Sequence, residues 1–214
     1  MEKTEYLSCE PEFLLVQMTD RDEDIRPEFE YIKDHTARGF LLLSVRVNDW
    51  FADLSPWEAP PVFGKTPFRG GAESTLSALE TEIIPEALEG LPRGVKTVLG
   101  GYSLSALFAL WGGYNYEGLY GIAAASPSVW YEGWDAYIRT RRMTCKNVYL
   151  SVGDREEKAK NPVMARVGDR IRDTYSYLCS QGVSAVLEYN EGNHFRDADI
   201  RTAKAFLDIM KRDG

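Results

Sequence analysis

Cysteine is scarce in this chain of 214 residues. Cys9, Cys145 and Cys179 are odd in number and widely spaced, which argues against a disulfide framework and against a CxxC metal or redox site. The sequence also has no apolar run long enough to span a bilayer, and its N-terminus lacks the charged-then-apolar layout of a signal peptide. Free thiols and the absence of a leader predict a cytoplasmic protein.

Runs of Lys and Arg are absent as well, and the formal net charge is -8 at pH 7. A surface of this charge has no general attraction to phosphate backbones or to anionic lipid. We therefore expect neither nucleic acid nor a membrane as a partner.

The chain does contain a repeated alternation of apolar strands with amphipathic helices. Strands are predicted over residues 13–18, 40–47, 95–99, 119–124, 147–152 and 185–189, and helices within 27–33, 75–88, 105–111, 162–179 and 198–210. This alternation predicts a single α/β domain over residues 1–214, with a mainly parallel sheet and helices on both faces. Residues 48–72 show neither period and are predicted to form a long, functional loop.

The segment from Lys96 to Trp111 places a strand, a turn of small residues and an apolar helix in immediate succession. A nucleophile elbow requires this order, because its serine sits on a strained turn between a strand and a helix. The positions two before and two after Ser103 must then be small, and they are Gly101 and Ser105. A plain strand-to-helix connection with a serine N-cap would give the same pattern, so the segment alone leaves both interpretations open.

Histidine supplies an independent constraint, because the chain contains only His35 and His194 and a nucleophilic serine needs one as its base. His194 follows the strand over 185–189 and precedes the last helix, so it should emerge at the same sheet edge as Ser103. His35 ends a polar helix, where a histidine interacts favourably with the helix dipole. Ser103 and His194 are therefore predicted as nucleophile and general base.

The chain order serine, acid, histidine places the acid after the strand over 147–152. Asp154, Glu156 and Glu157 follow that strand. Glu156 is favoured, because a residue or two of turn is needed before a side chain can reach the imidazole; Asp154 is second and Glu157 third. The alternative is that all three belong to a solvated charge cluster with the nearby lysines.

Four segments resemble an esterase family of the α/β-hydrolase superfamily that includes esterase D and the siderophore and feruloyl esterases. They are residues 101–105 (GYSLS), 125–130 (ASPSVW), 153–156 (GDRE) and 192–195 (GNHF). The resemblance spans most of the chain. It implies a compact α/β-hydrolase fold, and it gives Ser103, Glu156 and His194 the roles of the family's catalytic triad.

The chain departs from this family at two places. Ser105 stands where many members have glycine, and the first strand is followed by Met18-Thr19-Asp20 in place of a His-Gly oxyanion motif. The amide of Leu104, at a helix N-terminus, is predicted as one oxyanion donor. The second is expected just after the first strand, with Thr19 as first choice. The chain is also short at its N-terminus, so we expect the outer antiparallel strands of larger relatives to be missing.

The predicted reaction is hydrolysis of a small-molecule carboxylic ester through an acyl-enzyme, which calls for no metal and no cofactor. Substrate contacts are expected from Trp50 and Trp57 in the long loop and from Trp130 after the Ser-Pro-Ser turn. Only about twenty residues separate that turn from the strand at 147, too few for a sizeable cap domain. We therefore predict an open site.

Two alternatives share these residues. The same triad permits acyl transfer to an acceptor other than water, and a non-catalytic binding module can keep the fold without the activity. Nucleotide binding would need a phosphate loop, and residues 100–103 have neither the GxGxxG spacing nor a P-loop lysine. The exposed Trp-rich loop is also compatible with a homo-oligomer.

Overall fold

The computed structural model describes residues 1–212, in which seven strands form one sheet in the order β1-β3-β2-β6-β7-β8-β9. The strands are β1 Glu2–Leu7, β2 Phe13–Thr19, β3 Phe40–Arg46, β6 Lys96–Tyr102, β7 Gly121–Ala125, β8 Asn147–Gly153 and β9 Ser184–Asn190. Only β1 pairs antiparallel, with β3, and every other neighbouring pair is parallel. The predicted mainly parallel sheet is confirmed.

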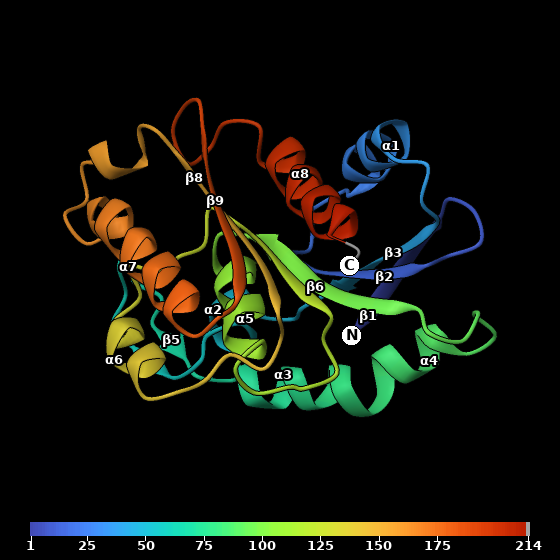
Figure 1. Ribbon diagram of the computed structural model, residues 1–214. Coiled ribbons are helices and arrows are strands. Elements are labelled where there is room, and N and C mark those ends of the chain that lie inside the picture. Colours follow the sequence, from blue (N-terminus) through green and yellow to red (C-terminus); the bar gives the residue numbers. More distant parts are fainter. Residues whose placement is uncertain (213–214) are drawn as a thin grey trace.

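Helices cover both faces of the sheet (Figure 1). The helices are α1 Arg26–His35, α2 Trp50–Asp53, α3 Ala72–Ala78, α4 Ile84–Leu88, α5 Leu104–Gly112, α6 Trp134–Arg139, α7 Val167–Ser180 and α8 Ala198–Lys211. Helices α1 and α8 lie on one face, and α3 to α7 lie on the other. The short α6 is the one helix between β7 and β8, so no cap domain is inserted there.

Side-chain alternation along the strands divides the core into two clusters. In β2, Phe13 and Leu15 pack in the cluster with α1 and α8, whereas Leu14, Val16 and Met18 pack in the cluster with α3, α5 and α7. Both sets are fully buried because a central parallel strand has a helix layer on each face. Helix α5 is buried along its whole length, which explains its almost purely apolar sequence.

The structure corrects the expectation that outer antiparallel strands are missing. Strand β1 adds an antiparallel edge to the sheet, pairing from Glu2↔Arg46 to Leu7↔Leu41. Its sequence is mainly polar and its residues are mainly exposed, so it has no hydrophobic pattern to identify it. Backbone pairing holds the strand, and the ion pair between Arg46 and Glu2, at 2.5 Å, reinforces its end.

The segment predicted as an irregular loop over 48–72 contains short regular pieces. Asp49 caps α2, accepting hydrogen bonds from the amides of Phe51 and Ala52 at 3.1 and 3.0 Å. The two-residue strands β4 (Glu58–Ala59) and β5 (Phe68–Arg69) pair with each other further along. Elements of two to four residues are too short for periodicity to identify.

The helix predicted over 75–88 is present, but it is interrupted. Between α3 and α4 the chain forms a π-helical turn, η1 Leu79–Ile83. Pro85 follows within the first turn of α4. A proline has no N–H to donate to the preceding turn, so a change in helical register at this point is expected. Among residues 1–212, no helix is long and apolar enough to cross a bilayer.

Glu28, in the first turn of α1, is buried to 3% exposure, and its Oε2 has no hydrogen-bond partner. Burial raises the pKa of Glu28 to about 7, and the charge of Glu23 adds to the rise. The folded protein therefore holds a proton that the unfolded chain releases near its ordinary pKa of 4.5. Stability contributed by this proton is present below about pH 4.5 and is lost as the pH rises to about 7.

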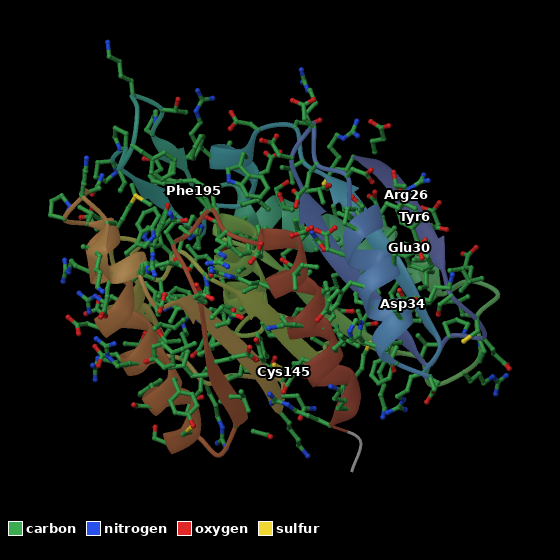
Figure 2. All side chains as sticks on the ribbon, turned by 90° about the horizontal axis from the view of Figure 1, so that it is seen from above. Tyr6, Arg26, Glu30, Asp34, Cys145 and Phe195 are labelled. Atoms are coloured by element: carbon green, nitrogen blue, oxygen red, sulfur yellow. The ribbon has the colours of Figure 1, made fainter. Side chains whose placement is uncertain are left out.

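We predict that Glu28→Gln, which mimics the protonated acid, raises the free energy of unfolding above pH 7 by up to about 3 kcal/mol. The difference from the parent should disappear near pH 4, where both side chains are neutral. Urea denaturation across this pH range measures it. Glu30→Gln, on the exposed face of α1 (Figure 2), is the matched control. A gain that does not depend on pH would contradict the prediction.

Candidate active site

Ser103 lies between β6 and α5 in a backbone conformation that non-glycine residues rarely adopt, with φ 59° and ψ -117°. Two hydrogen bonds hold this strained turn: Ser103 N donates to Ala125 O at 3.2 Å, and Ser128 N donates to Ser103 O at 3.1 Å. A Cβ at Gly101 would collide with the Ser105 side chain, so glycine is required there. The turn presents Ser103 at the N-terminus of α5, at the C-terminal edge of the sheet.

Ser105, the residue that departs from the family's glycine, ties this turn to β2. Its side chain is buried, and its Oγ donates to the carbonyl of Met18 at 2.9 Å. The end of β2 is thereby held beside the first turn of α5. Leu104 is the first residue of α5, so its N–H is one of those that have no acceptor within the helix.

Thr19 is the last residue of β2, and its carbonyl accepts from Val47 N at 3.1 Å on the β3 side. The N–H and C=O of one strand residue point to the same side, so the Thr19 N–H also faces β3 and not the Ser103 turn. The first amide after the strand is that of Asp20, which donates to Oε2 of Glu23 at 3.2 Å. The geometry therefore does not favour Thr19 as the second oxyanion donor.

Three side chains from three strand ends form one hydrogen-bonded chain. Nε2 of His194 lies 3.0 Å from Oγ of Ser103, and Nδ1 of His194 lies 2.8 Å from Oε2 of Glu156. Glu156 begins the 3-10 turn η2 (Glu156–Lys158) after β8, and His194 lies in the loop between β9 and α8. The parallel strands β6, β8 and β9 end at the same edge, so these distant residues converge.

The other candidate residues point elsewhere. Asp154 accepts from Gly192 N at 2.7 Å, and Glu157 pairs with Arg172 at 3.3 Å. Glu156 is the one carboxylate of the three that contacts His194. His35 is exposed and its Nδ1 lies 2.8 Å from Tyr31 O, in keeping with the predicted place at a helix end.

Glu156 is deeply buried, with its side chain 3% exposed. Its Oε1 accepts from Ser126 Oγ at 2.7 Å, Gly153 N at 2.7 Å and Arg201 Nη1 at 3.2 Å. Burial by itself raises the pKa of Glu156, but the hydrogen bond and charge of His194, with the bonds from Ser126 and Gly153, hold that pKa below its ordinary value. The carboxylate is therefore ionised beside the imidazole.

Two residues that the sequence did not identify complete the surroundings of His194. The hydroxyl of Tyr102 donates to the carbonyl of His194 at 2.7 Å and accepts from Arg201 Nη1 at 3.1 Å. A sequence signal for Arg201 exists, because Arg201, Ala205 and Ile209 share one face of α8 at intervals of four. An arginine on an otherwise apolar helix face indicates a buried partner.

Comparison with solved structures identifies the fold. Siderophore hydrolase EstA from Aspergillus nidulans matches with a TM-score of 0.74 at 18% identity, over 95% of this chain and 84% of that chain. An IroE-like serine hydrolase from Shewanella oneidensis gives 0.77 at 13% identity, over 96% and 74%. The enterobactin hydrolase IroE in complex with DFP gives 0.64 at 19% identity, over 92% and 82%.

This chain has the α/β-hydrolase fold. At these identities the likeness establishes the fold alone. No family model matches the sequence, and no curated protein matches it. Within the described residues 1–212, no three histidine, cysteine, aspartate or glutamate side chains are grouped to hold a metal ion.

A cavity of about 500 Å³ opens beside His194. Its wall is mainly apolar, and its lining residues include Trp130, Met164 and Val167 together with Glu156 and His194. Its remaining lining residues are Arg155, Lys158, Ala159, Lys160, Asn161, Asn193 and Phe195. The ring of Phe195 is 85% exposed and stands at the surface on the loop that carries His194 (Figure 2).

Of the three tryptophans predicted to contact substrate, Trp130 alone lines this cavity. Trp50 begins α2 and packs against the core. Trp57 donates from Nε1 to Glu132 O at 2.8 Å and lines a separate cavity with Tyr137. The ring of Trp57 thus contacts the segment after β7 and is not part of the lining of the cavity beside His194.

Gly153 marks the closest backbone approach in the site. A Cβ there would collide with Gly192 O and would lie 3.1 Å from both Arg201 Nη1 and Glu156 Oε1. We predict that Gly153→Ala lowers the free energy of unfolding by about 1–3 kcal/mol, as measured by urea denaturation.

Gly112→Ala, in α5, is the control for this substitution, because a Cβ there meets only Leu99 Cδ2 at 3.1 Å and Leu76 Cδ1 at 3.5 Å. Both atoms are the ends of side chains that can move. If Gly153→Ala is as stable as the parent, the close approach of Gly192 O to Gly153 is not needed to hold the loop that carries His194.

Proposed function

We propose that this chain is a serine esterase that hydrolyses carboxylic esters with Ser103 as nucleophile, His194 as general base and Glu156 as the acid of the triad. The observation that carries the proposal is the continuous contact from Ser103 Oγ to His194 Nε2, at 3.0 Å, and from His194 Nδ1 to Glu156 Oε2, at 2.8 Å. A serine in this geometry can lose its proton as it attacks.

In the proposed mechanism, His194 Nε2 takes the proton of Ser103 while Oγ bonds to the carbonyl carbon. The negative charge that develops on the carbonyl oxygen is stabilised by the Leu104 N–H, which is worth roughly 3 kcal/mol. The tetrahedral intermediate then expels the alcohol, which receives the proton from His194. Glu156 fixes the tautomer with the proton on Nδ1 and stabilises the imidazolium.

Deacylation repeats these steps with water. His194 takes a proton from the water molecule, whose oxygen attacks the acyl carbon, and the acid leaves as Ser103 regains its proton. No metal or organic cofactor enters either half of the reaction.

The cavity beside His194 is the proposed site for one side of the ester. Its volume of about 500 Å³ and its apolar wall suit a small-molecule substrate with an apolar group. Several similar structures are named as hydrolases of siderophores or of enterobactin. Ester hydrolysis by a serine nucleophile is the reaction class that those names and this triad have in common.

We predict that a fluorophosphonate probe labels the parent protein at Ser103. Ser103→Ala should abolish labelling, and His194→Ala should slow it by roughly 100-fold or more, because the base that activates the serine is gone. Peptide mapping by mass spectrometry locates the label without knowledge of the substrate.

Ser128→Ala is the matched control, since Ser128 Oγ lies 3.3 Å from Ser103 Oγ and is the neighbouring hydroxyl that could carry a misplaced label. This variant should still be labelled at Ser103. A folded parent that stays unlabelled would refute the triad and favour a non-catalytic binding module. A labelled protein that forms esters with added alcohols faster than it releases acid would be an acyltransferase.

We predict that Trp130→Ala lowers discrimination between large and small ester groups by roughly tenfold in kcat/KM, since an aromatic wall contributes about 1.4 kcal/mol. Two series of esters, one varied in the acyl group and one in the alcohol, measure it. The series that responds identifies the group held in the cavity. Trp57→Ala, which removes a tryptophan of the separate cavity, is the control and should change neither series.

A further inference from the structure

Arg201 is a buried cation that the proposed mechanism does not use. It lies in the first turn of α8 and is 2% exposed. A guanidinium at this depth is stable only when it is paired and hydrogen-bonded, and its partners here are the groups that hold the triad. We propose that Arg201 is a positioning residue, which anchors Glu156 through one carboxylate oxygen and sets the pH range in which the Glu156–His194 pair accepts the proton of Ser103.

This inference rests on the proposed function. Its first support is that the two oxygens of Glu156 have different hydrogen-bond partners. Oε2 faces Nδ1 of His194 at 2.8 Å. Oε1 takes the other donors: Ser126 Oγ, Gly153 N and Arg201 Nη1, at 2.7, 2.7 and 3.2 Å. A carboxylate pinned through one oxygen cannot rotate away, so the other oxygen stays directed at the imidazole.

The second support is that the same guanidinium holds the backbone of the loop between β9 and α8, which carries His194 and is called the histidine loop below. Arg201 Nη2 donates to Glu191 O at 2.9 Å, three residues before His194. Arg201 Nη1 also reaches the hydroxyl of Tyr102 at 3.1 Å, and that hydroxyl donates to His194 O at 2.7 Å. The Arg201 side chain thus joins the end of β6, the turn after β8 that carries Glu156, and the loop between β9 and α8 that carries His194.

The third support is electrostatic. A positive charge in direct contact with Glu156 opposes the arrival of a second positive charge, the proton, on the Glu156–His194 pair. Removing that charge should make the pair bind its proton more tightly, so the pair should titrate at a higher pH. The base would then be lost at a higher pH in the variant than in the parent.

Other charged groups near the pair are exposed and remain in every variant. Arg155, Lys158 and Lys160 line the cavity that also contains His194. On the histidine loop, Glu191 pairs with Arg196 at 2.8 Å and Arg196 with Asp197 at 3.3 Å, and in the acid turn Asp154 lies 4.0 Å from Arg155. Charges at the surface are screened by salt, whereas the contact between Arg201 and Glu156 is not.

The test is an NMR titration of the two histidines, which needs no substrate. His194 reports on the pair, and His35 is an internal reference because it lies at the end of α1 and contacts Tyr31 O instead. Arg201→Met and Arg201→Gln should move the His194 midpoint upward by roughly one pH unit, whereas Arg201→Lys, which keeps the charge, should leave it close to that of the parent. The His35 midpoint should stay constant.

The rate of fluorophosphonate labelling at Ser103 gives the second readout. In Arg201→Met and Arg201→Gln, the acidic limb of the pH profile of this rate should shift to higher pH together with the NMR midpoint of His194. In Arg201→Lys the limb should stay in place while the maximum rate falls by roughly tenfold, because a lysine cannot reproduce the contacts of two guanidinium nitrogens.

Arg212→Met is the matched control, because Arg212 follows the other end of α8 and donates to Val148 O at 3.2 Å, far from the triad. It should lower stability without moving the midpoint or the limb. If folded Arg201→Met and Arg201→Gln keep the His194 midpoint of the parent, the proposal that Arg201 sets the pH range is overturned. If Arg201→Lys is labelled at the full rate of the parent, the proposal that Arg201 positions Glu156 is overturned. A parent that is never labelled would instead refute the proposed function, so the two failures are distinguishable.

Discussion

A carboxylate buried as deeply as that of Glu156 loses hydration that only nearby donors and cations can replace. In this protein the replacements come from four separate segments: the Ser126 hydroxyl, the Gly153 amide, the His194 imidazole and the Arg201 guanidinium. Each segment must therefore stand at its own place for the charge to be tolerated. The buried negative charge thus constrains the turns after β7 and β8, the histidine loop and the start of α8 together.

Local features of the backbone follow from this constraint. Ser126 has φ 45°, in the left-handed region that a serine rarely adopts, and its hydroxyl meets Glu156 from there. Gly153 has no side chain because the chain at Gly192 passes too close to it. Ser103 is strained in the same way on the neighbouring turn, so two adjacent strand ends store strain where the chain turns sharply.

Trp130 and Trp57 line different cavities near this edge of the sheet. Trp130 packs at 6.2 Å from Phe63 and closes one side of the cavity beside His194. The ring of Trp57 lies 5.2 Å from the ring of Tyr137 and is tilted against it, and its Nε1 donates to Glu132 O in the chain that leads to α6. Tryptophan content alone predicted three contact residues, and of these Trp130 lines the cavity beside His194.

The sequence by itself determined the alternation of the parallel strands β2, β3, β6, β7, β8 and β9 with the longer helices, because hydrophobic periodicity is a local property of each of these segments. It also limited the candidate triad, since only two histidines exist and only His194 follows a strand toward the edge that holds Ser103. The choice of Glu156 over Asp154 rested on turn length, and the structure brings Glu156 to the imidazole.

Tertiary structure alone decided the features that depend on contacts between distant segments. Strand β1 is polar and is held by backbone pairing with β3, so no pattern in its own residues marks it. The Thr19 amide faces β3 because β2 pairs on both sides, and successive residues direct their backbone groups alternately to β3 and to β6. Arg201 can be buried because the folded chain places Glu156, 45 residues earlier, within hydrogen-bond distance of its guanidinium. Periodicity can show that a residue faces the core, but only the fold decides which charge it meets there.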